Sequence, residues 1–435
     1  MPSVSTDPAH ADDVRRAAQF VASRLAAAGS LTVRTMSGYG NPLIYAEWLG
    51  APGKPTVLVY GHYDVQPPDP LEKWNSPPFT PTVRDGRLYG RGVSDDKGPM
   101  LIPIKVAEAF FAADRPLPIN VKWMIEGEEE IGSPHLESFI AQHRDLLAAD
   151  VVLSADGGMW RIDEPSLTLS NRGLAGLELT VTGAAKDLHS GRHGGAVANP
   201  LHAVAELVAS LHDADGRVAV AGFYDRVRAL SEGERADIAR LPFDEDVYLA
   251  QIGAPAAVGE PGYSTLERQW TRPTLEVNGM CGGYQGPGQK TVIPSEAHAK
   301  ITCRLVPDQE PDEILALVIR HLDSHLPAGV RLVTGAGDHG ARAAHIPPDH
   351  PVLKAAAAAL TVACGTAPLM VRMGGTVPLA EIFQRVMRLD TVYFSFSTGD
   401  EDFHAPNEFF RIHRLHEGLE AWARLWTILG EAPAP

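Results

Sequence analysis

The sequence predicts an α/β fold in which a doubly wound, mixed or parallel sheet forms one domain and a smaller α+β domain is inserted into it. Two observations predict this fold. Strand-like and helical segments alternate from residue 55 to residue 158, and such alternation is typical of a doubly wound sheet. From about residue 173 the strands instead have one apolar and one polar face, until the first pattern resumes near His345.

The first domain begins with an amphipathic helix over residues 7–29, which Gly29 ends. The continuous apolar run in "PTVLVYGHYD" predicts a strand that is covered on both faces. A hairpin is predicted at "VRDGRLYGRG", and the helix after it has Ser94, Asp95 and Asp96 at its start, where carboxylates suit unpaired N–H groups. The elements that follow are this helix over 94–114, a strand at 119–127, a helix at 134–148 and a strand at 150–158.

The inserted domain opens with the alternating strand "LAGLELTVTG", and a helix follows from about Asn199 to Leu211. Its later elements are strands at 271–280, 295–307 and 330–337 and a helix at 312–326. The first domain resumes with a helix at 350–364 and the strand "DTVYFSF". We therefore expect residues 1–172 and 346–435 to form the two parts of the first domain and residues 173–345 to form the insertion.

Bulk properties narrow the class of protein. A chain of 435 residues is too long for a single core, and a formal net charge of -16 argues against nucleic acid or a membrane surface as a partner. The three cysteines are widely spaced, which argues against a disulfide framework or a thiolate metal site. The first residues show no signal pattern, and the longest small-apolar run, 355–364, is too short for a bilayer. We expect a cytoplasmic protein.

Four glutamates crowd into the stretch "MIEGEEEIGS", directly after an apolar strand and with no Lys or Arg among them. Ligands of open α/β sheets bind beyond the carboxyl ends of the strands. Five segments bring polar residues to that edge: they carry His62 and Asp64; Asp95; Glu129 and Glu130; Asp156; and Asp400, Glu401, Asp402 and His404. Each has a plain explanation when taken singly, such as a helix cap, a solvated acidic run or a surface histidine. Together they predict cations among the carboxylates.

The expected ligands are oxygen and imidazole without thiolate. This set suits Zn²⁺, Mn²⁺ or Co²⁺. We expect Zn²⁺ first, with Mn²⁺ or Co²⁺ as alternatives, although the ligands do not choose among them. There are enough ligands for two ions that share one carboxylate, which is an arrangement that activates water for hydrolysis.

Nine motifs, spread over nearly the whole chain, carry a family resemblance. They are "VLVYGHYDVQP", "GRLYGRGVSDDKGP", "EGEEEIGS", "SADGG", "KDLHSG", "KTVIP", "RLVP", "GGTVP" and "DEDFHAPNE". In this order they resemble the dinuclear metallopeptidase family of carnosinases, glutamate carboxypeptidases and aminoacylases, and most closely its cytosolic non-specific dipeptidase branch. Relatives usually carry a further helix before "PSVSTDP", so either the protein starts upstream or this member lacks that helix.

The resemblance implies two divalent metal ions per subunit. One ion would be held by His62, Asp95 and Asp156, and the other by Asp95, Glu130 and His404.

The resemblance also implies roles for the neighbours of these ligands. Glu129 would be the general base, and Asp64 would orient the His62 ring. The peptide bond between Asp95 and Asp96 would be cis. Glu128 is interpreted as structural or solvent-facing.

The inserted domain would act as a lid and a dimerisation domain. His189 would reach the active site of the other subunit of a homodimer and stabilise the oxyanion, and the alternative is a histidine buried at the surface of its own domain. An Arg fork such as that of Arg304 suits a free C-terminus. The implied substrate-binding residues are Arg304, Asn278, Gly374, Gly375, Thr376 and His350.

The predicted function is a metallopeptidase, namely a broad-specificity dipeptidase that acts on small peptides. The alternative is a deacylase of N-acyl or N-succinyl amino acids, which would share the di-metal site and differ only in its pocket. A non-catalytic binding module should have lost ligands or the base, yet all of them are present. The glycines around "YGRGVSD" lack the GxGxxG spacing of a dinucleotide-binding loop.

Overall fold

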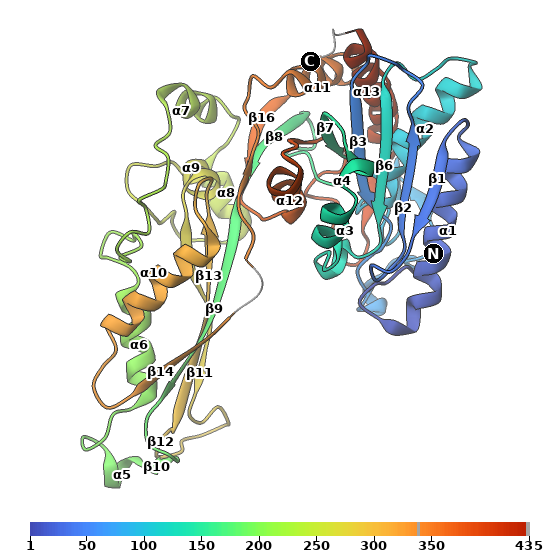
Figure 1. Cartoon of the computed structure of the whole chain (residues 1–435). Coiled ribbons are helices and arrows are strands. Elements are labelled where there is room, and N and C mark those ends of the chain that lie inside the picture. The colour runs from blue at the N-terminus through green and yellow to red at the C-terminus, as the bar shows by residue number, and fades with distance from the viewer. Residues whose placement is uncertain (337–339, 432–435) are drawn as a thin grey trace. The chain divides into compact units, whose positions relative to one another are not determined.

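A computed structural model describes residues 1–336 and 340–431 of the chain (Figure 1). The chain divides into two compact units. Unit 1 comprises Met1–Leu169, Ile346–Val371 and Ile382–Pro435, and unit 2 comprises Ser170–His345 and Arg372–Glu381. The predicted fold class, an α/β domain interrupted by an α+β segment, is confirmed. No helix in the described ranges has the length and apolar character that crossing a membrane requires.

Unit 1 is built on a six-stranded mixed sheet with the order β1-β2-β6-β3-β7-β17. Strands β6, β3, β7 and β17 are parallel to one another, whereas β2 is antiparallel to β6 and the edge strand β1 is antiparallel to β2. The strands are β1 (Thr32–Met36), β2 (Leu43–Trp48), β3 (Thr56–His62), β6 (Asn120–Glu126), β7 (Val151–Ser154) and β17 (Thr391–Tyr393).

Helices cover both faces of this sheet (Figure 1). On one face Val57, Val59 and Trp123 pack into a core shared with α1, α2, α11 and α13. On the other face the side chains of Tyr45 and Lys122 both donate to the carbonyl of Leu146 in α4. This double cover explains the continuous apolar runs of the strands. The helices are α1 (Ala11–Ala27), α2 (Lys97–Ala112), α3 (Leu136–Gln142), α4 (Arg144–Leu147), α11 (Pro351–Cys364) and α13 (Ile412–Glu431).

The predicted hairpin forms a small second sheet in unit 1. Asp85 and Gly86 both have positive φ, as a two-residue hairpin turn requires. The sheet is completed by a strand from the end of the chain and has the order β18-β5-β4. The strands are β4 (Thr82–Arg84), β5 (Arg87–Tyr89) and β18 (Phe409–Arg411), and short 3-10 turns lie at η1 (Pro8–His10), η2 (Leu71–Lys73) and η3 (Glu129–Ile131).

Two predicted helices differ from those observed. Helix α2 begins at Lys97 rather than residue 94, and Asp96 makes no capping bond at its start. Its Oδ2 instead accepts the backbone N–H of His62 at 3.1 Å, so the polar start of the segment belongs to the sheet edge. The helix expected at 134–148 is two helices, because His143 leaves the helical conformation and its ring packs 4.5 Å from that of Phe139.

Unit 2 is built on an antiparallel sheet with the order β11-β13-β9-β14, and α6 and α10 pack on one face (Figure 1). Alternate residues such as Leu177, Leu179 and Ile301 enter that core, while Glu178 and Lys300 are exposed, as the alternating pattern predicts. These elements are β9 (Gly173–Thr182), β11 (Thr274–Gly282), β13 (Glu296–Leu305), β14 (Arg331–Ala336), α6 (Pro200–Ser210) and α10 (Pro311–Ser324).

Unit 2 also contains several smaller elements. They are β10 (Leu188–His189), α5 (Ser190–His193), α7 (Glu232–Ala239), α8 (Glu245–Ile252), α9 (Thr265–Thr271), β12 (Val292–Ile293) and β15 (Ala344–His345). The chain passes between the units four times: once directly after β15, and once within each of β8 (Ser166–Asn171), β16 (Leu369–Met373) and α12 (Pro378–Met387).

Candidate functional site

The five predicted segments do meet at one sheet edge, all within unit 1, although not every polar residue that they carry joins the cluster there. Strand β3 ends at His62, and η3 brings Glu129 and Glu130 just beyond β6. Asp156 follows β7 by two residues. Asp95 precedes α2, and His404 lies in the loop before β18. The parallel strands therefore present their carboxyl ends, and the side chains beyond them, to one place.

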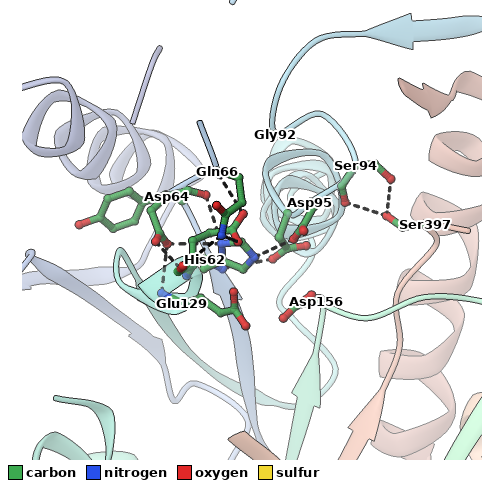
Figure 2. A network of polar contacts seen from close by, with 12 residues as sticks. His62, Asp64, Gln66, Gly92, Ser94, Asp95, Glu129, Asp156 and Ser397 are labelled. Atoms are coloured by element: carbon green, nitrogen blue, oxygen red, sulfur yellow. Dashed lines mark hydrogen bonds and ion pairs between the residues drawn. The ribbon is translucent and has the colours of Figure 1, made fainter. Parts of the chain in front are cut away.

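Asp95 stands between two histidines, with one carboxylate oxygen toward each. Its Oδ1 lies 3.0 Å from Nε2 of His62 (Figure 2). Its Oδ2 lies 2.9 Å from Nε2 of His404. Burial opposes the ionisation of Asp95, but hydrogen bonds from His404 and His62 lower its pKa. The Asp95 hydrogen bond raises the pKa of His404 to about 10. In each of these contacts a proton lies between an imidazole nitrogen and an oxygen of Asp95. A metal cation could take the place of that proton.

Burial by itself would lower the pKa of His62. Hydrogen bonds to Asp64 and Asp95 outweigh it and raise that pKa well above the ordinary value. The ring is therefore held in a strongly negative setting.

The spacing of these donors fits a divalent cation. One ligand atom from each of His62, Asp95 and Glu130 lies within 4.8 Å of the others. Glu130 Oε2 also lies 3.2 Å from Nε2 of His404. Ligand atoms around a tetrahedral zinc ion with bonds of about 2.05 Å are about 3.3 Å apart, close to the 3.2 Å between Glu130 and His404 and the 3.0 Å between His62 and Asp95. The residues present therefore fit the metal that the resemblance implies.

Asp156 and Glu129 complete the cluster. Figure 2 shows both side chains turned toward the contact between His62 and Asp95. Burial raises the pKa of Asp156 to about 6, with a further contribution from Asp95. Burial also raises the pKa of Glu129 well above its usual value, and Asp156 and Asp95 add to the shift. Crowded carboxylates of this kind are stabilised in their charged form by cations placed among them.

Asp64 joins His62 to the turn that follows β6. It is fully buried, and its Oδ1 lies 3.4 Å from Nδ1 of His62. Its two oxygens also accept the backbone N–H groups of Glu129 at 3.3 Å and Glu130 at 3.1 Å. Nδ1 of His62 lies 3.2 Å from the backbone oxygen of Asp64 as well, so it faces acceptors only. The ring proton therefore belongs on Nδ1, which leaves Nε2 as the ligating atom.

Gln66 is a contact residue that the sequence prediction missed. Its side chain donates to Oε2 of Glu130 at 2.9 Å, and its backbone N–H donates to Oε1 at 3.1 Å. A signal for it was present, because His62, Asp64 and Gln66 are spaced two apart, as residues on one side of an extended segment are.

Glu408 was also missed, and it holds the backbone around Asp95. It is fully buried. Its Oε1 accepts the N–H groups of Ser94 at 2.9 Å and Asp95 at 3.1 Å, and its Oε2 accepts a bond of 2.8 Å from Arg91. The peptide bond between Asp95 and Asp96 is cis, as the resemblance implies. Glu408 is the last residue of the motif "DEDFHAPNE", but nothing in that motif assigned it a role.

Two of the acidic residues near His404 do not join the cluster. Asp400 and Glu401 both form ion pairs with Arg411, and Glu401 also accepts from the hydroxyl of Ser94. Glu128, interpreted as structural or solvent-facing, is buried, so of these two alternatives only the structural one agrees with the structure.

Several predicted substrate-binding residues lie together in unit 2. Arg304 donates from Nη1 to Oγ1 of Thr376 at 2.7 Å. Arg172, which was not predicted, donates from Nε to the carbonyl of Gly374 at 2.9 Å and from its backbone N–H to that of Gly375 at 3.1 Å. Burial, with repulsion from Arg304, lowers the pKa of Arg172 to about 10. Both arginines line a cavity of about 510 Å³ in unit 2, which suits an anion.

The three remaining predicted residues lie in separate settings. His189 is exposed in unit 2, and its Nδ1 accepts the N–H of Gly191 at 3.0 Å. Asn278 is exposed at a β-bulge of β11, a feature that re-aims side chains. His350 caps α11 by accepting the N–H of Val352, and its Nε2 lies 3.6 Å from Asp390.

Comparisons with known proteins agree with this geometry. Residues 58–427 match the model of Peptidase family M20/M25/M40. The chain is 32% identical over 399 residues to the Beta-Ala-His dipeptidase of Mus musculus, covering 90% of this chain and 80% of that protein. It is 30% identical over 453 residues to the Cys-Gly metallodipeptidase of Saccharomyces cerevisiae, covering 100% and 94%.

A solved structure extends the likeness to the fold. The M20 family metallo-carboxypeptidase of Sulfolobus solfataricus superposes with a TM-score of 0.84 at 30% identity, covering 99% of this chain and 96% of that one.

Proposed function

Because the chain belongs to peptidase family M20/M25/M40 and is a metallopeptidase, we propose that it hydrolyses the peptide bond of dipeptides with broad specificity. The observation that carries the proposal is the Asp95 carboxylate, which offers one oxygen beside His62 and the other beside His404. The relatives named for Beta-Ala-His and Cys-Gly hydrolysis support dipeptides as the substrate class. Unit 1 would carry the chemistry, and unit 2 would act as the lid.

The proposed metal site holds two divalent ions, with Zn²⁺ as the first choice and Mn²⁺ or Co²⁺ as alternatives. His62 and Asp156 would hold one ion and Glu130 and His404 the other, with Asp95 shared between them. The ions would supply Lewis-acid polarisation of the scissile carbonyl and would make a water molecule more acidic.

Glu129 is the proposed general base. Its carboxylate would take a proton from the attacking water and pass it to the nitrogen of the leaving amine. Two observations support the assignment. The backbone N–H of Glu129 donates to Asp64, and the side chain of Glu129 turns toward the cluster (Figure 2). Asp64 would keep the proton of His62 on Nδ1.

The proposed site for the substrate's C-terminal carboxylate consists of Arg304, Thr376 and the backbone of Gly374 and Gly375. Two sets of contacts support a preformed anion site. Arg304 donates to Thr376, and Arg172 donates to the carbonyls of Gly374 and Gly375. Asn278 and His350 are proposed as further contacts, although the capping bond of His350 occupies its Nδ1.

We propose a homodimer in which His189 of one subunit serves the site of the other. Because Nδ1 of His189 accepts a bond from Gly191, the neutral ring carries its proton on Nε2, ready to donate to an oxyanion. Mixed dimers of His189→Ala and Glu129→Ala subunits should regain part of the activity, since one site would then have neither defect. A verified heterodimer without activity would place each site within one chain.

A cytoplasmic location is proposed as well. The cysteines Cys281, Cys303 and Cys364 are free thiols, which supports a reducing compartment.

The deciding experiment is turnover of a dipeptide panel beside longer peptides and N-acetyl and N-succinyl amino acids. Enzyme stripped by a chelator would be compared with enzyme reconstituted with Zn²⁺, Mn²⁺ or Co²⁺. Metal-dependent cleavage of dipeptides alone is the expected result and would rank the metals. Preference for acyl amino acids would favour the deacylase, which the names of the relatives do not support, and cleavage of longer peptides would favour a carboxypeptidase.

A further inference from the structure

Glu128 is a buried carboxylate next to the proposed base and outside the metal cluster. The residue is 7% exposed, and it directly precedes Glu129 and Glu130. Its Oε2 lies 2.7 Å from Nδ1 of His135, and its Oε1 accepts the backbone N–H of Asn41 at 3.1 Å. A buried charge with two donors is held firmly in one position.

The segment around Asn41 is shaped to receive this carboxylate. A Cβ at Gly40 would lie 1.9 Å from Oε1 of Glu128, so there is no space for a side chain at this position. Gly40 also has a φ of +68°, a conformation that favours glycine. The side chain of Asn41 donates to the carbonyl of Gly127 at 2.8 Å. Asn41 therefore forms hydrogen bonds to Gly127 and Glu128, the two consecutive residues before Glu129.

The backbone of Glu128 starts the turn that carries the two functional glutamates. Its carbonyl accepts the N–H of Ser133 at 2.8 Å and that of Ile131 at 3.2 Å. The N–H groups of Glu129 and Glu130 are bound by Asp64. The turn is thus fixed by Asp64 through its amides and by Glu128 through the chain that enters it.

We propose that Glu128 is a positioning residue, and that its carboxylate, held by Asn41 and His135, fixes the backbone from which Glu129 and Glu130 project. The inference rests on the proposed function, in which Glu129 moves the proton. Displacing a catalytic group by about 1 Å costs on the order of 100-fold in rate, so a loosened turn should lower kcat.

The test compares Glu128→Leu with Glu128→Gln in the zinc-reconstituted enzyme. Leucine fills the space without either bond, whereas glutamine keeps an acceptor for Asn41 and offers an N–H₂ to Nδ1 of neutral His135. We expect Glu128→Leu to lower kcat for a dipeptide by about 10- to 100-fold, with KM within about twofold and metal content unchanged. Glu128→Gln should stay within about threefold of the wild-type kcat.

Two further variants separate positioning from general damage. His135→Ala should lower kcat less, and combined with Glu128→Leu it should add nothing, because both act through one contact. Glu137→Leu is the matched control. Glu137 lies in the neighbouring helix α3 and pairs with Arg385 of α12, so its loss should leave kcat unchanged. Thermal unfolding checks that each variant is folded.

The outcomes are distinct. Wild-type enzyme that cleaves no dipeptide would refute the proposed function itself. Active wild-type enzyme with an unaltered kcat in Glu128→Leu and His135→Ala would overturn the positioning role. An equal loss in Glu128→Gln, or in the Glu137→Leu control, would overturn it as well, and so would a change confined to KM.

Discussion

Replacing Asp64 with asparagine should weaken metal binding without removing a ligand. The carboxylate serves three donors at once: Nδ1 of His62 and the backbone N–H groups of Glu129 and Glu130. Asparagine has nearly the same shape, but only one of its two terminal atoms can accept. Its N–H₂ group must therefore face at least one donor, and a fully buried side chain cannot turn to water.

The size of the effect follows from that mismatch. A buried donor left without an acceptor costs about 1–3 kcal/mol. Since about 1.4 kcal/mol corresponds to a tenfold change in an equilibrium constant, the affinity for zinc should fall about 10- to 100-fold. The loss acts through the tautomer of His62 and the placement of Glu130, so saturating zinc should restore most of the activity.

The assay is competition for Zn²⁺ between the protein and a chelator of known affinity, with kcat then measured at saturating metal. Asp163→Asn is the matched control, because Asp163 is exposed and forms an ion pair with Arg161. Zinc affinity in Asp64→Asn equal to that of the wild type would refute the assignment. Lost affinity with no recovery of kcat at saturating zinc would show that Asp64 acts mainly on Glu129.

Three other results are expected. Glu129→Gln should retain both ions by metal analysis and lose about 10²- to 10⁴-fold in kcat, and a smaller loss would point to another base. Arg304→Ala should lower kcat/KM for a dipeptide by about 10- to 100-fold and barely alter that for its C-terminal amide, and equal losses would remove Arg304 from carboxylate binding. In chelated protein, burial raises the pKa of Glu126 to about 7 from 4.5, so the folded state binds its proton more tightly and this residue contributes stability at low pH that is lost as pH rises through 7. Glu126→Gln keeps an acceptor for Tyr60 and Ser133. Between pH 4 and pH 8, the free energy of unfolding of this variant, measured with urea, should therefore rise by about 3 kcal/mol relative to that of the wild type. A difference between the two proteins that does not change with pH would contradict the raised pKa.

The sheet and the set of metal-ligand candidates could be predicted because both leave local signals. Apolar runs mark strands covered on both faces, and parallel strands end at one edge. His62 and Asp156 follow such runs directly, so their convergence needed no tertiary information. Strands β1 and β2 were not predicted. The residues of β1, such as Arg34 and Thr35, are largely exposed, and the buried run of β2 is short.

The start of α2 shows where a local rule is overridden. Asp96 stands at the position of a helix cap, and its residue type suits one. Its carboxylate turns instead to the backbone N–H of His62, 34 residues earlier in the chain. A capping rule compares only neighbours in sequence, so it cannot recognise that the sheet edge offers a competing donor.

The residues that hold the metal-ligand candidates in place are harder to predict than the candidates themselves, because their partners are also distant in sequence. Glu408 binds the backbone of Asp95 across 313 residues, and Glu128 binds that of Asn41 across 87. Each uses a carboxylate to satisfy backbone N–H groups in irregular segments, where no strand or helix partner exists. Irregular backbone is what lets His62, Asp95 and Glu129 converge from separate elements, and it is also what leaves amides unpaired. Part of the negative charge around this site is thus explained by the backbone it supports, and only the remainder, centred on Asp95, by the cations it would bind.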